Sequence, residues 1–299
     1  MRLAYESAAV RVPATTANMG PGFDSFGMAF RYYDEVEVRP VTGPTRVEIE
    51  GVGAGTVPTD DDNLVVRALR DGLEAVGAPQ AGFEMRCVNR IPHGGGMGSS
   101  ASAAVAGLML ARGLLSEPQA LSDDEVFLIA TRFEGHPDNV APAVFGGATV
   151  AWVERGGHPR MAPMPVDASL GVSLLIPPST TRLSTKEARQ VLPVSVPRED
   201  ALFNTSRAAV LMLALAGRPD LLMADEPTGA LDLDSSGVVL DWLRRLASQG
   251  TTVVMVTHDV EAAALADSVA VMSGGRLATW SSCRDAQRIA ELVHAARAR

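Results

Sequence analysis

The residues best suited to chemistry lie in a glycine-rich stretch in the first half of the chain. Gly94-Gly-Gly-Met-Gly98 is followed directly by Ser99 and Ser100 at the predicted mouth of a helix. Glycines let the backbone approach an anion closely, and a helix N-terminus supplies unpaired N–H donors with a partial positive charge. The pattern predicts a phosphate-binding loop, although glycines alone leave a plain surface turn open as the alternative.

Two apolar runs near the C-terminus also end in residues that could do chemistry. Leu221-Leu-Met-Ala-Asp225 ends in a carboxylate, and Thr251-Thr-Val-Val-Met-Val-Thr-His258 ends in an imidazole. Runs of this kind are typical of buried strands, and a helix is expected between them at 236–248. Two buried strands joined by a crossover helix predict part of a parallel sheet.

The elements that must position the glycine-rich loop are predicted from apolar periodicity. A strand should lead into the loop and a helix of small residues should leave it, with Asn63 as the cap of an earlier helix and Gly217 as a helix stop. Strands are expected at 8–14, 35–41, 47–50, 83–89 and 171–176, and helices at 63–76, 103–115, 123–132 and 201–216. No repeat or low-complexity linker marks a domain boundary.

Composition narrows the class of protein. The 299 residues are 46% hydrophobic and 20% charged, which is typical of a globular α/β protein that buries a substantial core. A net charge of -9 argues against nucleic acid as the main partner. Cys87 and Cys283 are too few and too far apart to indicate a disulfide framework or a zinc site. With no signal-peptide pattern and no long apolar run, the expected location is the cytoplasm, without membrane insertion.

Four motifs carry a resemblance to a known family. They are Val12–Gly27 (Val-Pro-Ala-Thr-Thr-Ala-Asn-Met-Gly-Pro-Gly-Phe-Asp-Ser-Phe-Gly), Pro92–Ser102, Glu134–Pro142 and Ser184–Arg189. In this order they resemble homoserine kinases of the GHMP kinase superfamily. The resemblance implies an α+β fold with a ribosomal S5-like N-terminal domain and a ferredoxin-like C-terminal domain. One departure is that Gly94-Gly95 stands where such kinases usually have a small residue and an arginine, which bears on local loop flexibility alone.

The same resemblance implies transfer of the ATP γ-phosphoryl group to the hydroxyl of L-homoserine, a step in threonine biosynthesis. The expected cofactors are ATP and Mg²⁺. Ser99 or Ser100 would hold the metal together with Glu134, because a hydroxyl and a carboxylate suit a hard octahedral cation. The loop residues expected around the triphosphate are Pro92, Gly94, Gly95, Gly96, Gly98, Ser99, Ser100 and Ala101.

The amino-acid substrate would be gripped by Asn18, Asp24, His136, Asp138, Thr185 and Arg189, which match the family's positions. Arg189 suits a bidentate clamp on the substrate carboxylate and Asp24 suits its ammonium group. Asp138 is the candidate base and is grouped with Arg189 as catalytic, although a loose transition state can proceed without a base. The alternatives are loop capping for Asn18 and Asp24, and a buried, satisfied imidazole for His136.

The C-terminal part resembles a different family. Leu221–Asp232 is similar to the Walker B segment and D-loop of ABC-transporter ATPases, and Val254–Asp259 to their switch-histidine strand. Such ATPases also need a glycine-framed lysine loop. Lys186 is the single lysine of the chain and has no glycine frame, and the family's signature motif is missing as well. The ABC-like residues Asp225, Glu226, Asp232 and His258 are therefore expected to be a non-functional remnant.

Together these resemblances predict a chimeric chain joined within 215–224. The expected domains are 1–165, the ATP-binding domain; 166–223, a truncated second kinase domain; and 224–299, a partial P-loop NTPase α/β segment. Losing the end of the kinase would leave unpaired edges and exposed apolar surface, so weak or absent activity is expected.

Recombination, a sequence-assembly error and deliberate construction all remain open as origins of the join. The alternatives to a kinase are a non-catalytic nucleotide-binding or transporter-associated protein, and an ABC ATPase fragment. The expected partner is a small-molecule substrate, and a homodimer is left open.

Overall fold

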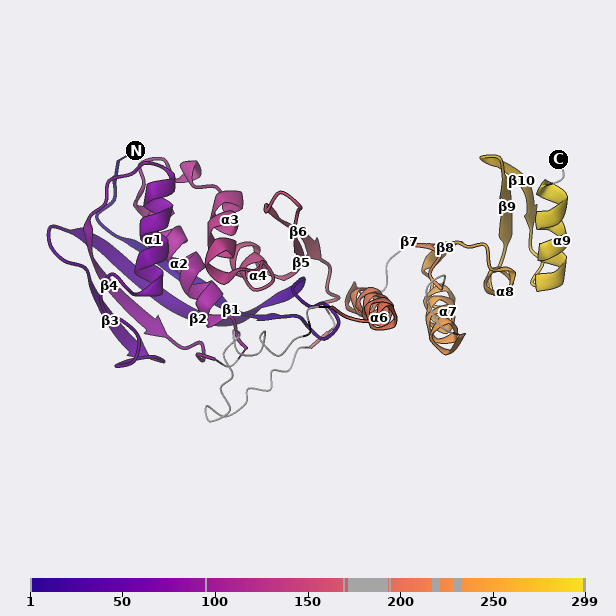
Figure 1. Cartoon of the computed structure of the whole chain (residues 1–299), viewed down its shortest axis with the longest axis horizontal. Helices are drawn as coiled ribbons and strands as arrows, with labels where there is room; N and C mark the ends of the chain where they lie inside the picture. Colours follow the sequence, from indigo (N-terminus) through magenta and orange to yellow (C-terminus); the bar gives the residue numbers. More distant parts are fainter. Residues whose placement is uncertain are drawn as a thin grey trace. The chain divides into compact units, whose positions relative to one another are not determined.

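The computed structural model describes residues 2–94, 96–168, 170–171, 193, 195–216, 221–228 and 233–297. The chain divides into two units, Met1–Ser195 and Val196–Arg299, which are described separately below (Figure 1). None of the helices in the described ranges combines the length and apolarity that spanning a bilayer requires. The predicted three-part division at 165 and 223 stays a prediction.

The first unit is built on a six-stranded, mostly antiparallel sheet. Its path runs β3-β4-β2-β5-β6, with β1 paired to β2, and only β3 and β4 are parallel. The strands are β1 (Ala8–Ala17), β2 (Phe26–Val41), β3 (Arg46–Gly51), β4 (Gly82–Asn89), β5 (Ala148–Val153) and β6 (Pro159–Met164). The long strand β2 pairs with three others, so it is the spine of the sheet.

Helices cover one face of this sheet (Figure 1). They are α1 (Leu64–Ala75), α2 (Ser99–Leu114), the 3₁₀ turn η1 (Pro118–Ala120), α3 (Asp123–Glu134) and α4 (Val140–Phe145). Along β2, Val36 and Val38 are buried while Glu37 and Arg39 are exposed, as expected of a strand with one covered face. The covered face meets the helices in a single large core that includes Phe83.

Most predicted elements of this unit are present. Asn63 caps α1 as predicted, since its side chain accepts a hydrogen bond from Val65 N at 2.9 Å. The structure adds α4, β5, β6 and the first half of β2, which the patterns did not identify. In β6 the reason is local: Pro159 and Pro163 weaken a strand signal, and the strand is tolerated because it lies at the sheet edge. The strand expected at 171–176 and the stop at Gly217 lie outside the described residues.

The second unit contains two separate pairs of strands. Its elements are α6 (Arg198–Ala216), β7 (Leu221–Asp225), α7 (Leu233–Ser248), β8 (Thr252–Val256), α8 (Val260–Ala263), β9 (Val269–Ser273), β10 (Arg276–Ser281) and α9 (Ala286–Arg297). β7 and β8 pair in parallel with α7 between them in sequence, which confirms the predicted parallel crossover. β9 and β10 form an antiparallel hairpin.

The prediction that β7 and β8 are buried is wrong. Met223 is 73% exposed and Val256 is 56% exposed. The physical reason is that β7 and β8 pair only with each other in the described part of the chain, so no further strands flank their apolar side chains there. An apolar run in the sequence is therefore not sufficient to make a buried strand.

Candidate active site

The glycine-rich loop leads directly into α2. Gly94, Gly96 and Gly98 have φ angles of 70°, 71° and 64°, which glycine adopts without strain. Gly98 is the N-cap of α2 and brings no capping side chain, so the N–H groups of the first turn remain available to an anion. Apart from its chain neighbours, no described residue lies within 4 Å of the position that a Cβ atom would take at Gly96. The geometry fits a phosphate group; Gly95 lies outside the described residues.

Strands β1 and β2 hold both ends of this loop. Asp34 on β2 accepts hydrogen bonds from Arg90 N at 2.5 Å and Ile91 N at 2.8 Å, where the chain leaves β4. At the other end, the buried Met97 packs with Ala14 and Ile91. Burial raises the pKa of Asp34, while the two backbone donors and nearby positive charge oppose part of that rise. The loop is thus anchored on the sheet rather than being a plain surface turn.

A cavity of about 220 Å³ lies beside the loop. Its walls combine apolar side chains such as Val36 with the polar groups of Asn63 and Asn89, and Ser99 lies at its border with α2. Such a cavity next to a phosphate-binding helix suits a flat heterocyclic base. Cys87 also lines it, but burial raises the pKa of this thiol to about 12, so it is a protonated wall residue. The sequence patterns did not identify this cavity.

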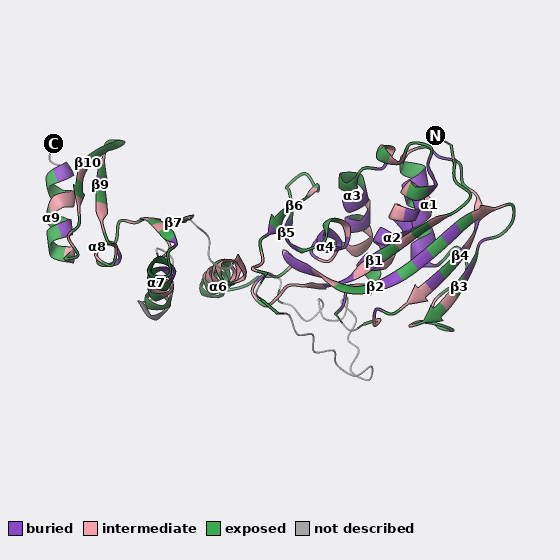
Figure 2. Cartoon of the chain, turned by 180° about the vertical axis from the view of Figure 1, so that it is seen from behind, coloured by how far each residue is buried: buried purple, intermediate pink, exposed green. Residues whose placement is uncertain are grey.

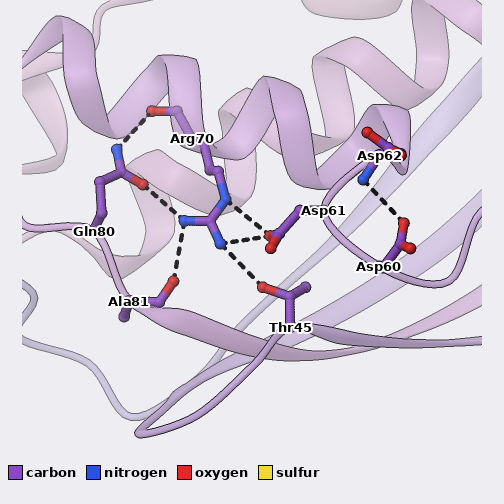
Figure 3. A network of polar contacts seen from close by, with 7 residues as sticks. All are labelled: Thr45, Asp60, Asp61, Asp62, Arg70, Gln80 and Ala81. Carbon is purple, nitrogen blue, oxygen red and sulfur yellow. Dashed lines mark hydrogen bonds and ion pairs between the residues drawn. The ribbon is translucent and has the colours of Figure 1, made fainter.

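One arginine fixes the segment that precedes α1 (Figure 3). Val57 and Asn63 of this segment line the cavity. Arg70 donates to Asp61 Oδ1 at 2.6 Å and to Thr45 Oγ1 at 3.0 Å. It also donates to Gln80 Oε1 and to the carbonyl of Ala81, both at 3.1 Å. The hydrogen bond from Arg70 lowers the pKa of Asp61. Four partners around one guanidinium hold the chain on both sides of α1 in place.

A hydroxyl and a carboxylate meet next to the loop. Ser100, in the first turn of α2, donates its Oγ hydrogen to Glu134 Oε1 at 2.5 Å. Glu134 is the last residue of α3, so two helices bring these oxygens together. Hard oxygen ligands of this kind fit Mg²⁺. Both predicted serines line the cavity, and Ser100 is the one that contacts Glu134.

Three of the predicted substrate residues form one cluster. Ligand atoms of Asp24, His136 and Asp138 all lie within 4.8 Å of one another. His136 Nδ1 is hydrogen-bonded to Asp138 Oδ1, which also accepts from Asn139 N at 2.8 Å. Asp138 is 1% exposed, and its Oδ2 has no hydrogen-bond partner within the described residues. A buried carboxylate oxygen is costly to leave unpaired, so this atom points to a donor on a ligand.

Asn18 shapes the loop that presents Asp24. Both residues have left-handed backbones, with φ of 67° and 56°. Asn18 Oδ1 accepts a hydrogen bond from Asp24 N at 2.9 Å, which is the loop-capping role that the sequence left open. The direct contact of Asn18 with substrate stays a prediction. Thr185 and Arg189 lie outside the described residues.

The ABC-like residues of the second unit also meet. Glu226 Oε1 accepts from His258 N at 2.9 Å and lies 2.7 Å from His258 Nδ1, at the ends of β7 and β8. Partial desolvation raises the pKa of Glu226, but the hydrogen bonds from His258 outweigh it and the net shift is downward. The His258 side chain is 81% exposed. The side chain of Asp225 and all of Asp232 lie outside the described residues.

Comparisons with known proteins give the family. Residues 63–147 match the GHMP kinases N terminal domain. The homoserine kinase of Clavibacter michiganensis subsp. michiganensis is 49% identical over 217 residues, covering 72% of this chain and 67% of that protein. The homoserine kinase of Mycolicibacterium vanbaalenii is 40% identical over 299 residues, covering 92% of this chain and 95% of that protein. The crystal structure of homoserine kinase from Cytophaga hutchinsonii shares the fold, with a TM-score of 0.57, 23% identity and coverage of 98% and 90%.

The length of these alignments tests the predicted join within 215–224. An alignment over 92% of the chain extends beyond what residues 1–223 alone could supply. The comparisons therefore give no support to a chimeric chain, to an ABC-transporter ATPase fusion or to a P-loop NTPase segment. They support the predicted GHMP-kinase-like α+β fold. By its similarity to these relatives over most of its length, the chain belongs to the homoserine kinase family.

Proposed function

We propose that this chain transfers the γ-phosphoryl group of ATP to the hydroxyl group of L-homoserine. The observation that carries the proposal is the Oδ2 atom of Asp138, which is buried and unpartnered in the described part of the chain. Asp138 is followed directly by Asn139, whose side chain bonds to the strand that anchors the phosphate loop. An acceptor group and an anion-binding helix therefore belong to one site.

The nucleotide half of the site is supplied by α2 and the cavity. The free N–H groups of the first turn of α2 would bind phosphate oxygens, and the cavity beside Asn63 would take the base. Ser100 and Glu134 are the residues that would hold Mg²⁺, whose charge would offset that of the phosphates. Phosphoryl transfer depends mostly on positioning and charge neutralisation, which is what these groups offer.

The acceptor half is supplied by the carboxylate cluster. Asp24 would pair with the ammonium group of homoserine, and Asp138 Oδ2 would accept the hydrogen of its hydroxyl group. In the transfer the hydroxyl oxygen bonds to the γ-phosphorus as the bond to the leaving ADP oxygen breaks. The hydroxyl proton passes to Asp138 or to solvent. Arg189 remains the predicted clamp on the substrate carboxylate, and Thr185 remains a predicted contact to the amino acid.

The rate of this reaction is a separate prediction. The relative that covers 72% of the chain is 49% identical, while the relative that covers 92% is 40% identical. That difference, together with the exposed apolar side chains of the second unit, supports a C-terminal part that has diverged from its relatives. Weak or absent activity stays a prediction made from the sequence, and the comparisons do not support it.

The test is a direct assay of purified protein. Release of ADP from Mg·ATP should depend on L-homoserine, and ³¹P NMR should detect a new phosphomonoester. L-2-Aminobutyrate, which lacks the hydroxyl group, is the matched control and should give no product. Tight binding of ATP without any homoserine-dependent product, or faster turnover of L-serine than of homoserine, would overturn the proposal.

A further inference from the structure

We propose that Thr15 is a positioning residue that couples the phosphate loop to the acceptor carboxylate of the site. Thr15 is fully buried, with 0% of its surface exposed. Its N–H donates to the carbonyl of Met97 at 3.1 Å, and its hydroxyl donates to Asn139 Oδ1 at 2.8 Å. One residue therefore contacts the loop before α2 and the segment before α4. The inference deepens the proposed function and rests on it for its catalytic consequence.

The strand geometry places Thr15 at this point. β1 and β2 pair regularly as far as Pro13 and Tyr33, and pairing resumes at Thr15 and Ala29. A shift of register in an antiparallel pair re-aims the side chains around it. Next to the shift, Ser102 Oγ donates to the carbonyl of Pro13 at 2.7 Å, which fixes α2 against the same stretch of β1. The shift thus lies where β1 meets the start of α2.

The side chain of Asn139 contacts Thr15 instead of capping its own helix. Asn139 is the N-cap of α4, a position where asparagine commonly accepts a hydrogen bond from its own helix. Here the side chain makes no capping bond to α4 and accepts the Thr15 hydroxyl instead. The N–H of Asn139 donates to Asp138 Oδ1 at 2.8 Å. The orientation of Asn139 therefore bears on the acceptor carboxylate directly.

Two glycines pack closely around the hydrogen bond between Thr15 and Asn139. A Cβ atom at Gly98 would lie 2.0 Å from Thr15 Oγ1 and 2.8 Å from Asn139 Oδ1. On the other side, a Cβ atom at Gly27 of β2 would lie 1.9 Å from the carbonyl oxygen of Asp138. The last glycine of the phosphate loop is thus packed against Thr15 and Asn139, and the backbone of Asp138 is packed against β2. Neither segment has room for a side chain at these two positions.

Removing the Thr15 hydroxyl is expected to misalign the phosphate loop and Asp138 without removing a group that reacts. Thr15→Val keeps the shape of the side chain but leaves Asn139 Oδ1 without its buried donor. We expect kcat to fall about 10²-fold, the scale of a misplacement near 1 Å, while KM for ATP changes less than about threefold. Thr15→Ser restores the hydroxyl and should recover most of kcat. A residue that only stabilised the fold would not show this split.

The structural test needs no substrate. In the full-length free protein, Thr15→Val should raise amide hydrogen exchange about tenfold in two segments, 96–101 and 136–141, together. Asn139→Ala removes the acceptor and should produce the same paired change. Combining the two substitutions should add nothing further, because both break one contact.

Thr131→Val is the matched control. Thr131 is also buried, and its hydroxyl donates to the carbonyl of Phe127 within α3 at 2.7 Å, so the variant loses one internal hydroxyl bond elsewhere. It should leave exchange at 96–101 unchanged. If Thr15→Val affects only one of the two segments, or matches Thr131→Val, the coupling is refuted. If the wild-type protein fails to phosphorylate homoserine, the proposed function is refuted. The hydrogen-exchange measurement still tests the coupling through Thr15 and Asn139, because it needs no substrate.

Discussion

The two units of this chain bury their residues to different extents (Figure 2). In the first unit, Leu69, Phe83 and Leu108 are fully buried between the sheet and its helices. In the second unit, Met272 is 61% exposed and Trp280 is 64% exposed, although both lie on regular strands. Secondary structure formed in both units, but the first has several helices over a six-stranded sheet, whereas the described strands of the second form two-stranded pairs with a small buried cluster that includes Val271 and Ile289. A large core requires a second layer over a wide sheet, whatever the local pattern.

The same difference separates the two sets of chemically interesting residues. Asp138 is held inside the first unit by Asn139 and His136, while the Glu226–His258 pair lies at the surface of the second. Buried groups in a fixed frame act strongly on a ligand because water does not screen them. Exposed pairs contribute little. The contrast predicts that substitutions in the first unit have large effects and those in the second have small ones.

The largest effect is expected from Asp138→Asn. The change keeps the size of the side chain but removes the carboxylate that is proposed to accept the hydroxyl hydrogen, so kcat for homoserine should fall about 10²–10⁴-fold. Thermal unfolding of the variant shows whether the fold is kept. Glu226→Gln, assayed in parallel, should leave kcat unchanged. Equal losses in both variants would break the contrast between the units.

A smaller but clear effect is expected on stability. Leu108→Ala empties a fully buried position on α2 and should lower the free energy of unfolding by about 2–5 kcal/mol. Leu277→Ala removes a side chain that is 56% exposed on β10 and should change it by about 0.5 kcal/mol or less. Urea denaturation followed by circular dichroism measures both. A large loss in Leu277→Ala would mean that this exposed strand contributes as much to stability as the buried positions of the first unit.

Within the first unit, Asp61→Asn should have a modest, pH-dependent effect. The Asp61 side chain is 61% exposed, so its pair with Arg70 is expected to contribute about 0.2–1 kcal/mol. Arg70 holds the pKa of Asp61 below its ordinary value of 3.8. The contribution is therefore present above about pH 4 and is lost as pH falls through the lowered pKa of the folded protein.

Urea denaturation at pH 7 and near pH 3 tests this pH dependence. The variant should be less stable than wild type at pH 7, and the gap should narrow as Asp61 becomes protonated. Asp62→Asn is the control, since Asp62 bonds to Asp60 through its backbone N–H (Figure 3). A gap that stays constant with pH would show that the pair with Arg70 is not its source.

The smallest effect is expected from Glu226→Gln on stability. The pKa of Glu226 is lowered by His258 after partial desolvation, so any stabilisation from the pair is present at neutral pH and is lost on acidification through the lowered pKa. Because both groups face solvent, the unfolding midpoint at pH 7 should not move measurably. A clear shift would show that this pair is structurally important.

Local features of this protein were readable from its sequence. The cap at Asn63, the alternation along β1 and the glycine-rich entry to α2 depend on neighbours within a few residues, so their types and spacing were enough. The parallel pairing of β7 and β8 was predicted from a different signal, two apolar runs with a helix between them in sequence. The four kinase-like motifs also indicated the family, because they are continuous stretches of sequence.

The tertiary structure alone decided how those motifs work together. The hydrogen bond between Thr15 and Asn139 joins residues 124 positions apart, and Arg70 joins segments on both sides of its own helix. The unpartnered oxygen of Asp138 and the exposure of Met223 likewise depend on which layers enclose them. Periodicity and caps report only short-range geometry. Burial and long-range contacts are set by the packing of whole elements, which no local pattern contains.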